Sequence, residues 1–149
     1  RARTSRYTGP MPLAKLSRHA LFYEIHPPRT RAAGGEVEPP PIVLVMGLGG
    51  RCAGWLPFQV PAFCEDRTVL IYDHRGVGQS EDPGEPQTTA ALGRDLVELL
   101  DVLGLEQVDA AGYSLGGMAG PGAAPAPPER ASRRRSKRRS PISTTARPR

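Results

Sequence analysis

The run IVLVM at residues 42–46 is apolar throughout, with no polar residue in alternate positions. A strand with one face in water alternates apolar and polar residues, whereas a strand covered on both faces is apolar along its length. RTVLIY at 67–72 shows the same pattern, and QVDAA at 107–111 is a third, shorter candidate. These runs predict strands of a parallel sheet that is covered by helices on both sides.

A helix is predicted between the second and third runs. Thr88 or Thr89 is a typical N-cap, and Gly104 stands where a C′ glycine belongs. One helical face collects the apolar positions Leu92, Leu96, Leu99, Leu100 and Leu103. A short helix is expected near residues 55–63, and ALFYEIH at 20–26 favours an outer strand. The alternation of strands and helices predicts an α/β fold with a doubly wound, mostly parallel sheet.

The third strand leads directly into GYSLG at residues 112–116, which fits the pattern G-x-S-x-G. In that turn a serine projects from a strained connection between strand and helix. Backbone segments crowd there, so the residues two positions before and after the serine, Gly112 and Gly116, must be small. Backbone N–H groups and the helix dipole at the start of the following helix favour a developing oxyanion. The pentapeptide alone is weak evidence. Its position after a predicted strand makes Ser114 a candidate nucleophile.

Two further motifs occur at the ends of the first two buried strands. The first includes the end of its strand and the loop after it, and the second is the loop after the second strand. They are VLVMGLGG at 43–50 and DHRGVGQS at 73–80. Together with GYSLGGM at 112–118, they resemble the α/β-hydrolase family in order and spacing, particularly its esterase, lactonase and C–C hydrolase branch. The resemblance extends from about Leu21 to Met118. It implies an α/β-hydrolase sheet that lacks the strands and helices after the nucleophile turn.

The resemblance also assigns roles to single residues. Ser114 is expected to be the nucleophile, and the backbone N–H groups of Leu48 and Leu115 are expected to form the oxyanion hole. Asp73 and Arg75 are expected to hold their loop in place by ion pairing and turn geometry. Gly76 and Gly78 are expected to supply turn conformations that other residues avoid. Trp55 is expected to pack, with a pocket-lining role as the alternative.

The residues after Ser114 do not complete a catalytic triad. A serine hydroxyl needs a base and an orienting acid, which follow the serine in this family. After Ser114 the only carboxylate side chain is that of Glu129, and the histidines at 19, 26 and 74 all precede the serine. Fragments PER at 128–130 and ISTTA at 142–146 resemble segments that family members carry at a similar distance after the nucleophile turn. This resemblance implies a truncated or frame-disturbed sequence. A genuine disordered basic tail is the alternative.

Charge is distributed unevenly between the predicted segments. Residues 130–149 contain nine basic residues and no acidic one, whereas 1–129 contain eleven basic against fifteen acidic residues. We expect a poorly ordered segment over 1–19, part of a hydrolase domain over 20–120, and a disordered tail over 121–149. The mildly acidic body and the absence of aromatic residues in the tail argue against specific nucleic-acid binding.

No metal or organic cofactor is expected. Cys52 and Cys64 are too few for a disulfide framework or a four-ligand zinc site, and are expected to be free thiols. No apolar stretch approaches the length of a membrane span. The sequence favours a cytoplasmic protein. Organelle targeting by the basic N-terminus and nuclear import through SRRRSKRRS at 132–140 stay open as alternatives.

Two functions follow from these observations. The first is a serine hydrolase that cleaves a small-molecule ester, lactone or similar acyl bond through Ser114, with this chain an inactive fragment. The second is a non-catalytic, hydrolase-like binding protein with a basic interaction tail. A later Asp and His in a continuous frame would support the first hypothesis.

Overall fold

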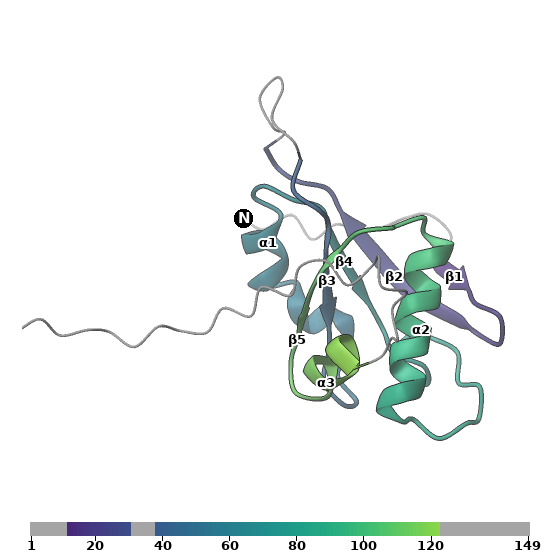
Figure 1. Ribbon diagram of the computed structural model, residues 1–149. Coiled ribbons are helices and arrows are strands. Elements are labelled where there is room, and N and C mark those ends of the chain that lie inside the picture. The colour runs from purple at the N-terminus through teal and green to yellow at the C-terminus, as the bar shows by residue number, and fades with distance from the viewer. Residues whose placement is uncertain (1–11, 31–37, 123–149) are drawn as a thin grey trace, which may run out of the picture.

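The computed structural model describes residues 12–30 and 38–122, which form one sheet with helices beside it (Figure 1). The strands are β1 (Leu13–Lys15), β2 (Ala20–His26), β3 (Ile42–Val45), β4 (Val69–Tyr72) and β5 (Asp109–Gly112). The helices are the 3₁₀ helix η1 (Cys52–Trp55) and the α-helices α1 (Gln59–Phe63), α2 (Thr89–Val102) and α3 (Leu115–Gly122).

The sheet is mixed, with the strand order β1-β2-β4-β3-β5. Strand β2 pairs antiparallel with both β1 and β4, whereas β3 pairs parallel with both β4 and β5. The carboxyl ends of β3, β4 and β5 therefore meet at one edge of the sheet, at the bottom of Figure 1. Each of the three sequence motifs includes the loop or turn that follows one of these strands, so the sheet brings all three together.

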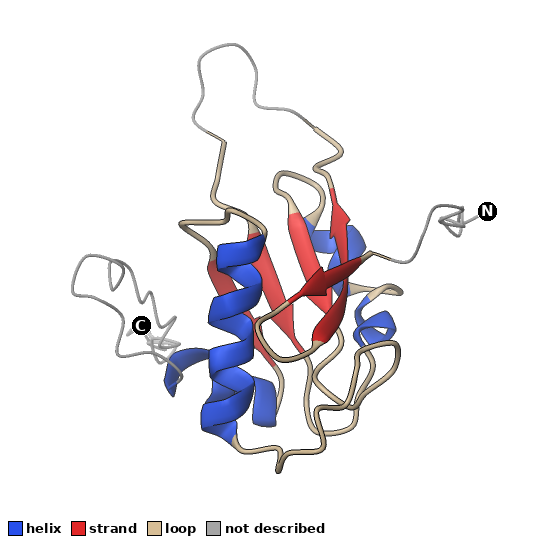
Figure 2. Ribbon diagram, turned by 90° about the vertical axis from the view of Figure 1, so that its right-hand side faces the viewer, coloured by secondary structure: helices blue, strands red, loops and turns tan. Residues whose placement is uncertain are grey.

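The core has two parts, one on each face of the sheet. On one face, Val43, Val45, Leu70 and Tyr72 pack with Leu96 and Leu99 of α2. On the other, Ile42, Leu44, Val69 and Ile71 pack with Cys52 of η1 and Val60 of α1. Figure 2 shows α2 on one side of the sheet and the two short helices on the other. Both faces of β3 and β4 are covered, which is why neither strand shows polar alternation.

The structure confirms the helix predicted over α2, together with its N-cap and its C′ glycine. The side chain of Thr88 accepts a hydrogen bond from the N–H of Ala91, and Gly104 has a φ of 68°. Leu92 and Leu99 are fully buried, while Leu100 and Leu103 are partly buried against the same core. One short helix was expected near residues 55–63. The structure has two, η1 and α1, which are separated by a turn between Trp55 and Gln59.

The expectation of a poorly ordered segment over residues 1–19 fails for residues 12–19. Strand β1 lies in this part and pairs with β2. Ala14 and Leu16 are buried in the core on the face of the sheet that α2 covers, so apolar burial orders a stretch that was expected to be poorly ordered. Residues 1–11 lie outside the part of the chain that the structure describes.

Strand β5 is the last strand of the described sheet and pairs only with β3 there. Helix α3 follows it and ends at Gly122, two residues past the expected domain boundary at 120. Pro121 lies in the last turn, where the helix is already ending. The rest of the expected disordered tail lies outside the described residues. Across 12–30 and 38–122, no helix is long and apolar enough to cross a membrane.

Candidate active site at the carboxyl edge of the sheet

Ser114 occupies the turn between β5 and α3 with a φ of 53°, the only positive φ of a non-glycine residue in 12–30 and 38–122. Left-handed backbone costs an L-residue roughly 1–2 kcal/mol, so surrounding contacts must hold it. The N–H of Gly116 donates to the Tyr113 carbonyl at 3.0 Å, and the N–H of Gly117 donates to the Ser114 carbonyl at 2.9 Å. The turn leaves Ser114 exposed to solvent.

The two glycines of the motif are required by close backbone contacts. A Cβ at Gly112 would lie 2.4 Å from the carbonyl carbon of Gly116. A Cβ at Gly116 would lie 2.1 Å from the carbonyl oxygen of Val45. Helix α3 therefore begins in direct contact with its own preceding strand and with the end of β3. No residue with a side chain fits at either position without moving backbone.

The loop after β3 runs beside the Ser114 turn. A Cβ at Gly47 would be 3.4 Å from the Cβ of Ser114, and the next residue is Leu48. Among the described residues the N–H of Leu48 donates no hydrogen bond. Leu115 is the first residue of α3, where N–H groups have no acceptor within the helix. Both predicted oxyanion donors thus belong to segments that adjoin Ser114.

Asp73 joins the loop after β4 to the loop after β3. One carboxylate oxygen accepts from the N–H of Cys52 at 2.7 Å, and the other accepts from the N–H of Gln79 at 3.1 Å. A Cβ at Gly78 would lie 2.0 Å from that second oxygen, so a glycine is needed there. Asp73 is 2% exposed, and it makes backbone hydrogen bonds instead of an ion pair with Arg75.

Arg75 pairs with Asp95 of α2, a partner that the sequence analysis missed. The guanidinium donates to both carboxylate oxygens, with 2.6 Å between Nε and Oδ2. This hydrogen bonding raises the pKa of Arg75. His19 Nε2 lies 3.3 Å from the same Oδ2. Asp95 follows Leu92 by three residues and therefore lies on the apolar face of α2. A carboxylate in that position is a sequence signal that it pairs with a buried cation.

The contacts that Ser80 and Glu81 make at the end of the loop after β4 were also missed. The Ser80 hydroxyl donates to the Asp73 carbonyl at 2.6 Å and accepts from the N–H of Phe22 in β2. Glu81 accepts from the N–H of Ala20 and donates its own N–H to the Ala20 carbonyl. The loop is therefore fastened to β2, and only the folded sheet brings these partners together. Gly76, with a φ of 67°, forms the turn beside them.

The three histidines of the chain are all described, and each has a neighbour other than Ser114. His19 lies beside Asp95, and His26 Nε2 lies 3.0 Å from a Glu24 carboxylate oxygen. His74 is 2% exposed, and its Nε2 lies 2.9 Å from the Met46 carbonyl oxygen. Burial lowers the pKa of His74. Its imidazole is enclosed beneath the site and is not presented to solvent beside Ser114.

Cys52 and Cys64 are both free and buried, as the sequence analysis expected. Burial, with a smaller effect of the Asp73 carboxylate, raises the pKa of Cys52 far above its usual range. Burial also raises the pKa of Cys64. A thiol must ionise to act as a nucleophile, so neither cysteine competes with Ser114 for that role. Trp55 is partly buried against the η1-side core, where it packs.

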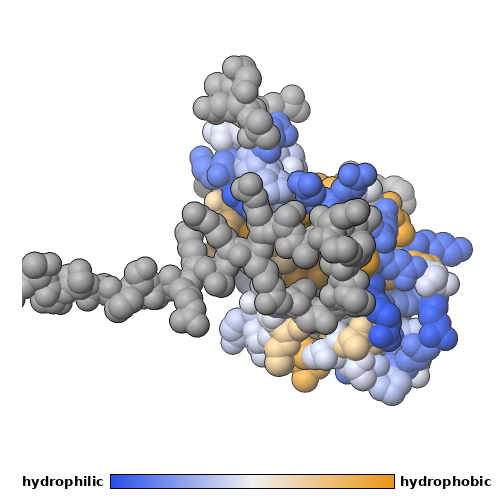
Figure 3. Space-filling model, viewed as in Figure 1, coloured by the Kyte–Doolittle hydropathy of each residue, from blue (hydrophilic) through white to orange (hydrophobic). Residues whose placement is uncertain are grey.

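The surface around Ser114 carries exposed apolar side chains. Leu48 is 74% exposed, Tyr113 68% and Met118 59%. Figure 3 shows apolar surface at the lower edge of the molecule, the end at which α3 lies in Figure 1. Such a surface suits an apolar substrate or further protein packed over the site.

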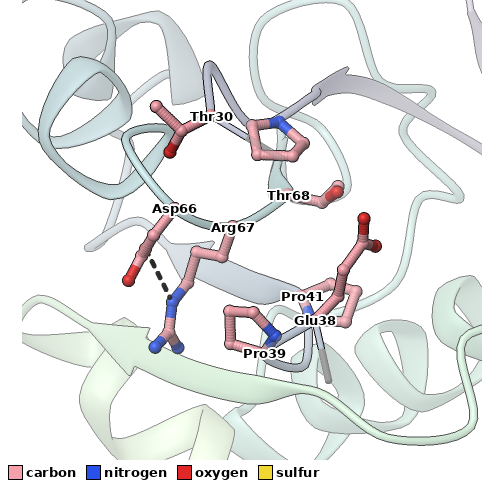
Figure 4. A pocket seen from close by; sticks show the side chains of 8 residues that line it. Thr30, Glu38, Pro39, Pro41, Asp66, Arg67 and Thr68 are labelled. Atoms are coloured by element: carbon pink, nitrogen blue, oxygen red, sulfur yellow. Dashed lines mark ion pairs between the residues drawn. The ribbon is translucent and has the colours of Figure 1, made fainter. Parts of the chain in front are cut away.

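A separate pocket opens at the opposite edge of the sheet, before β3 and β4. Its lining includes Thr30, Glu38, Pro41, Arg67 and Thr68 (Figure 4). Arg67 is engaged there by carboxylates, with its Nε 3.5 Å from Asp66 Oδ1 and its Nη1 2.7 Å from Asp109 Oδ2. None of the predicted site residues lines this pocket.

Known proteins are similar to this chain in sequence and architecture. A family model described as the alpha/beta hydrolase fold matches residues 40–132. The chain is 36% identical over 120 residues to the "Putative carbamate hydrolase RutD" of Azorhizobium caulinodans, and the match covers 80% of this chain and 41% of that protein. A protein of the same name from Caulobacter sp. is 39% identical over 101 residues, covering 67% and 35%.

Solved structures show the same likeness. The enol-lactonase from Burkholderia xenovorans LB400 matches with a TM-score of 0.63 and 37% identity, over 73% of this chain and 39% of that one. A hydrolase from Pseudomonas aeruginosa PA01 matches with a TM-score of 0.63 and 33% identity, over 76% and 40%. The chain belongs to the alpha/beta hydrolase fold family. It spans between 35% and 41% of the length of these relatives.

Proposed function

We propose that this chain carries the nucleophile and the oxyanion hole of a serine hydrolase that acts on ester-type acyl bonds. The observation that supports this most is the strained backbone of Ser114, which is held between β5 and α3 by Gly112 and Gly116. Strain of this kind is retained at functional sites because it aims a side chain that a relaxed turn would not aim.

The proposed chemistry is acyl transfer. The Ser114 oxygen attacks the carbonyl carbon of the substrate and loses its proton to a base. The carbonyl oxygen becomes an oxyanion that accepts hydrogen bonds from the N–H groups of Leu48 and Leu115. Expulsion of the alcohol or equivalent leaving group gives an acyl-enzyme, which water then hydrolyses. The substrate class is an ester, a lactone or a related acyl compound, in keeping with the lactonase and carbamate hydrolase names of the relatives.

The base and its orienting acid are the part of this mechanism that the described residues do not supply. His19, His26 and His74 are each engaged elsewhere, and histidine is the base that serine hydrolases of this fold use. We therefore expect catalysis only when this segment is joined to a partner segment that contributes both groups.

A fusion experiment tests the proposal. Residues 1–118 would be joined to the C-terminal part of the Burkholderia xenovorans enol-lactonase that follows its matched segment, and treated with a fluorophosphonate probe. Labelling is expected in the fusion and not in the 149-residue chain. Ser114→Ala should abolish it, whereas Ser17→Ala, which removes an exposed hydroxyl beside Glu98, should leave it intact.

Equal labelling of the fusion with alanine at 114 would show that Ser114 is not the nucleophile. A folded fusion that never labels would favour the alternative, a hydrolase-like binding protein without catalysis.

A further inference from the structure

We propose that His74 is a positioning residue that holds the Met46 carbonyl, and through it the Gly47–Leu48 segment, against the Ser114 turn. The hydrogen bond and its surroundings stand independently of any reaction. That the segment serves as an oxyanion donor rests on the proposed function.

The hydrogen bond fixes the state of the imidazole. A carbonyl oxygen only accepts, so at 2.9 Å His74 Nε2 must carry the proton. Burial lowers the pKa of His74, which keeps the ring neutral near pH 7 and leaves Nδ1 unprotonated. Nδ1 is buried and has no hydrogen-bond partner in the described part of the chain. The hydrogen bond to Met46 therefore satisfies the one N–H that the neutral ring carries.

Packing holds the ring in that orientation. His74 lies edge-to-face on Tyr72, with ring centroids 5.2 Å apart and planes at 82°. Tyr72 is 1% exposed in the core beneath α2, so it gives the imidazole a fixed support. The imidazole of His74 therefore has little freedom to follow the Met46 carbonyl if that carbonyl moves.

The carbonyl that His74 holds also adjoins the nucleophile turn. A Cβ at Gly116 would lie 2.7 Å from the Met46 carbonyl oxygen, so this oxygen faces the backbone two residues after Ser114. The Met46 carbonyl oxygen thus has both His74 and the start of α3 as neighbours. Rotation of the Met46–Gly47 peptide would shift Gly47, at which a Cβ would lie 3.4 Å from the Cβ of Ser114, and the N–H of Leu48 beyond it.

Two amide substitutions separate this role from simple space filling. The side-chain nitrogen of glutamine reaches about as far from the backbone as Nε2 of histidine, whereas that of asparagine reaches only as far as Nδ1. His74→Gln keeps a donor for Met46, and His74→Asn removes it while keeping a polar amide. Both variants lose the aromatic contact with Tyr72, so the pair differs mainly in the hydrogen bond.

The first measurement uses the unmodified 149-residue chain. Long-range ¹H–¹⁵N NMR of labelled histidine is expected to show His74 as a single Nε2–H tautomer at pH 7. A rapidly averaged mixture of tautomers, as in an exposed histidine, would overturn the proposal, and so would the Nδ1–H tautomer.

The second measurement follows the backbone and the reaction. In the 149-residue chain, His74→Asn should shift the Gly47 and Leu48 amide resonances and speed their hydrogen exchange, and His74→Gln should do so much less. In the fusion with the enol-lactonase segment, His74→Asn should slow probe labelling on the order of 10- to 100-fold, the cost of a misplaced catalytic group.

His74→Gln should recover most of that labelling rate. Equal rates for the two variants would overturn the positioning role. Labelling that is insensitive to Ser114→Ala would instead overturn the proposed function and leave the NMR result for His74 standing.

Discussion

The backbone of Gly116 lies against the carbonyl oxygen of Val45, so closely that a Cβ at Gly116 would stand 2.1 Å from it. Gly117, the next residue, would place its Cβ 3.4 Å from the nearest atom, an ordinary contact. The two neighbouring glycines therefore have different reasons to be glycine. The first allows α3 to start against the end of β3, and the second lies in the helix without a steric need.

Gly116→Ala should destabilise the chain, whereas Gly117→Ala should not. The first change forces backbone apart, and overpacking of this kind typically costs about 1–3 kcal/mol. The second places a better helix former in α3, which is worth up to about 1 kcal/mol in favour of the fold. Urea unfolding followed by circular dichroism measures both. A Gly116→Ala midpoint at or above that of Gly117→Ala would contradict the contact.

Ser114→Gly should stabilise the fold and Ser114→Ala should not. Glycine adopts a φ of 53° without the Cβ penalty, which is roughly 1–2 kcal/mol, although its greater freedom in the unfolded chain offsets part of the gain. Alanine retains the Cβ and the strain. Unfolding midpoints of the three proteins give the comparison. If glycine and alanine change stability alike, the left-handed turn is not formed in solution.

Asp95→Ala should cost up to about 3–5 kcal/mol, because it removes the buried carboxylate that pairs with Arg75 and leaves only Glu85, a more exposed carboxylate 3.4 Å from Nη1. Replacing both partners, Arg75→Met with Asp95→Leu, should recover part of this loss. The control is Arg29→Ala at an exposed pair with Glu65, for which less than about 1 kcal/mol is expected. Chemical denaturation measures all three, and a loss at Asp95 no larger than at Arg29 would refute the buried pair.

Stability should decline below about pH 6.5 through His74. Burial lowers the pKa of this imidazole in the folded protein, against smaller opposite effects of the Met46 carbonyl and the carboxylates of Asp95 and Asp73. The unfolded chain, with a pKa near 6.5, binds the proton first as pH falls, so acid favours unfolding. The stability contribution is complete above pH 6.5 and is lost as pH falls through and below that value.

We would measure the urea unfolding midpoints of the native chain and of His74→Gln at each pH and take their difference. Carboxylate titration affects both proteins, so the difference reports the contribution of His74. This difference should shrink between pH 7 and pH 5. A difference that grows on acidification would mean that the folded state binds the proton more tightly, contrary to the burial of the ring.

The 149-residue chain should hydrolyse a p-nitrophenyl ester no faster than its Ser114→Ala variant. The three histidines are engaged with Asp95, Glu24 and the Met46 carbonyl, so none is placed to take the proton of the serine. Initial rates at pH 8, corrected for spontaneous hydrolysis, provide the test. A clear rate that depends on Ser114 would show that a base reaches it after all.

Local patterns were sufficient for the elements that depend on neighbours in sequence. The apolar runs at 42–46 and 67–72 predicted strands covered on both faces, and Thr88 and Gly104 marked the ends of α2, because periodicity and capping act over a few residues. The spacing of Gly112, Ser114 and Gly116 similarly indicated the turn, since the crowding at Gly112 comes from backbone four and five residues later. The crowding at Gly116 comes from Val45 of β3 and became visible only in the folded sheet.

The tertiary structure decided which distant groups meet, and it did so for a physical reason. The pairing of Arg75 with Asp95, the hydrogen bond from His74 to Met46, and the order of β1 each depend on segments far apart in the chain. A charge or a short apolar stretch has many compatible partners when read alone. Only the folded sheet, by burying these groups and removing their water, decides which partners can satisfy them.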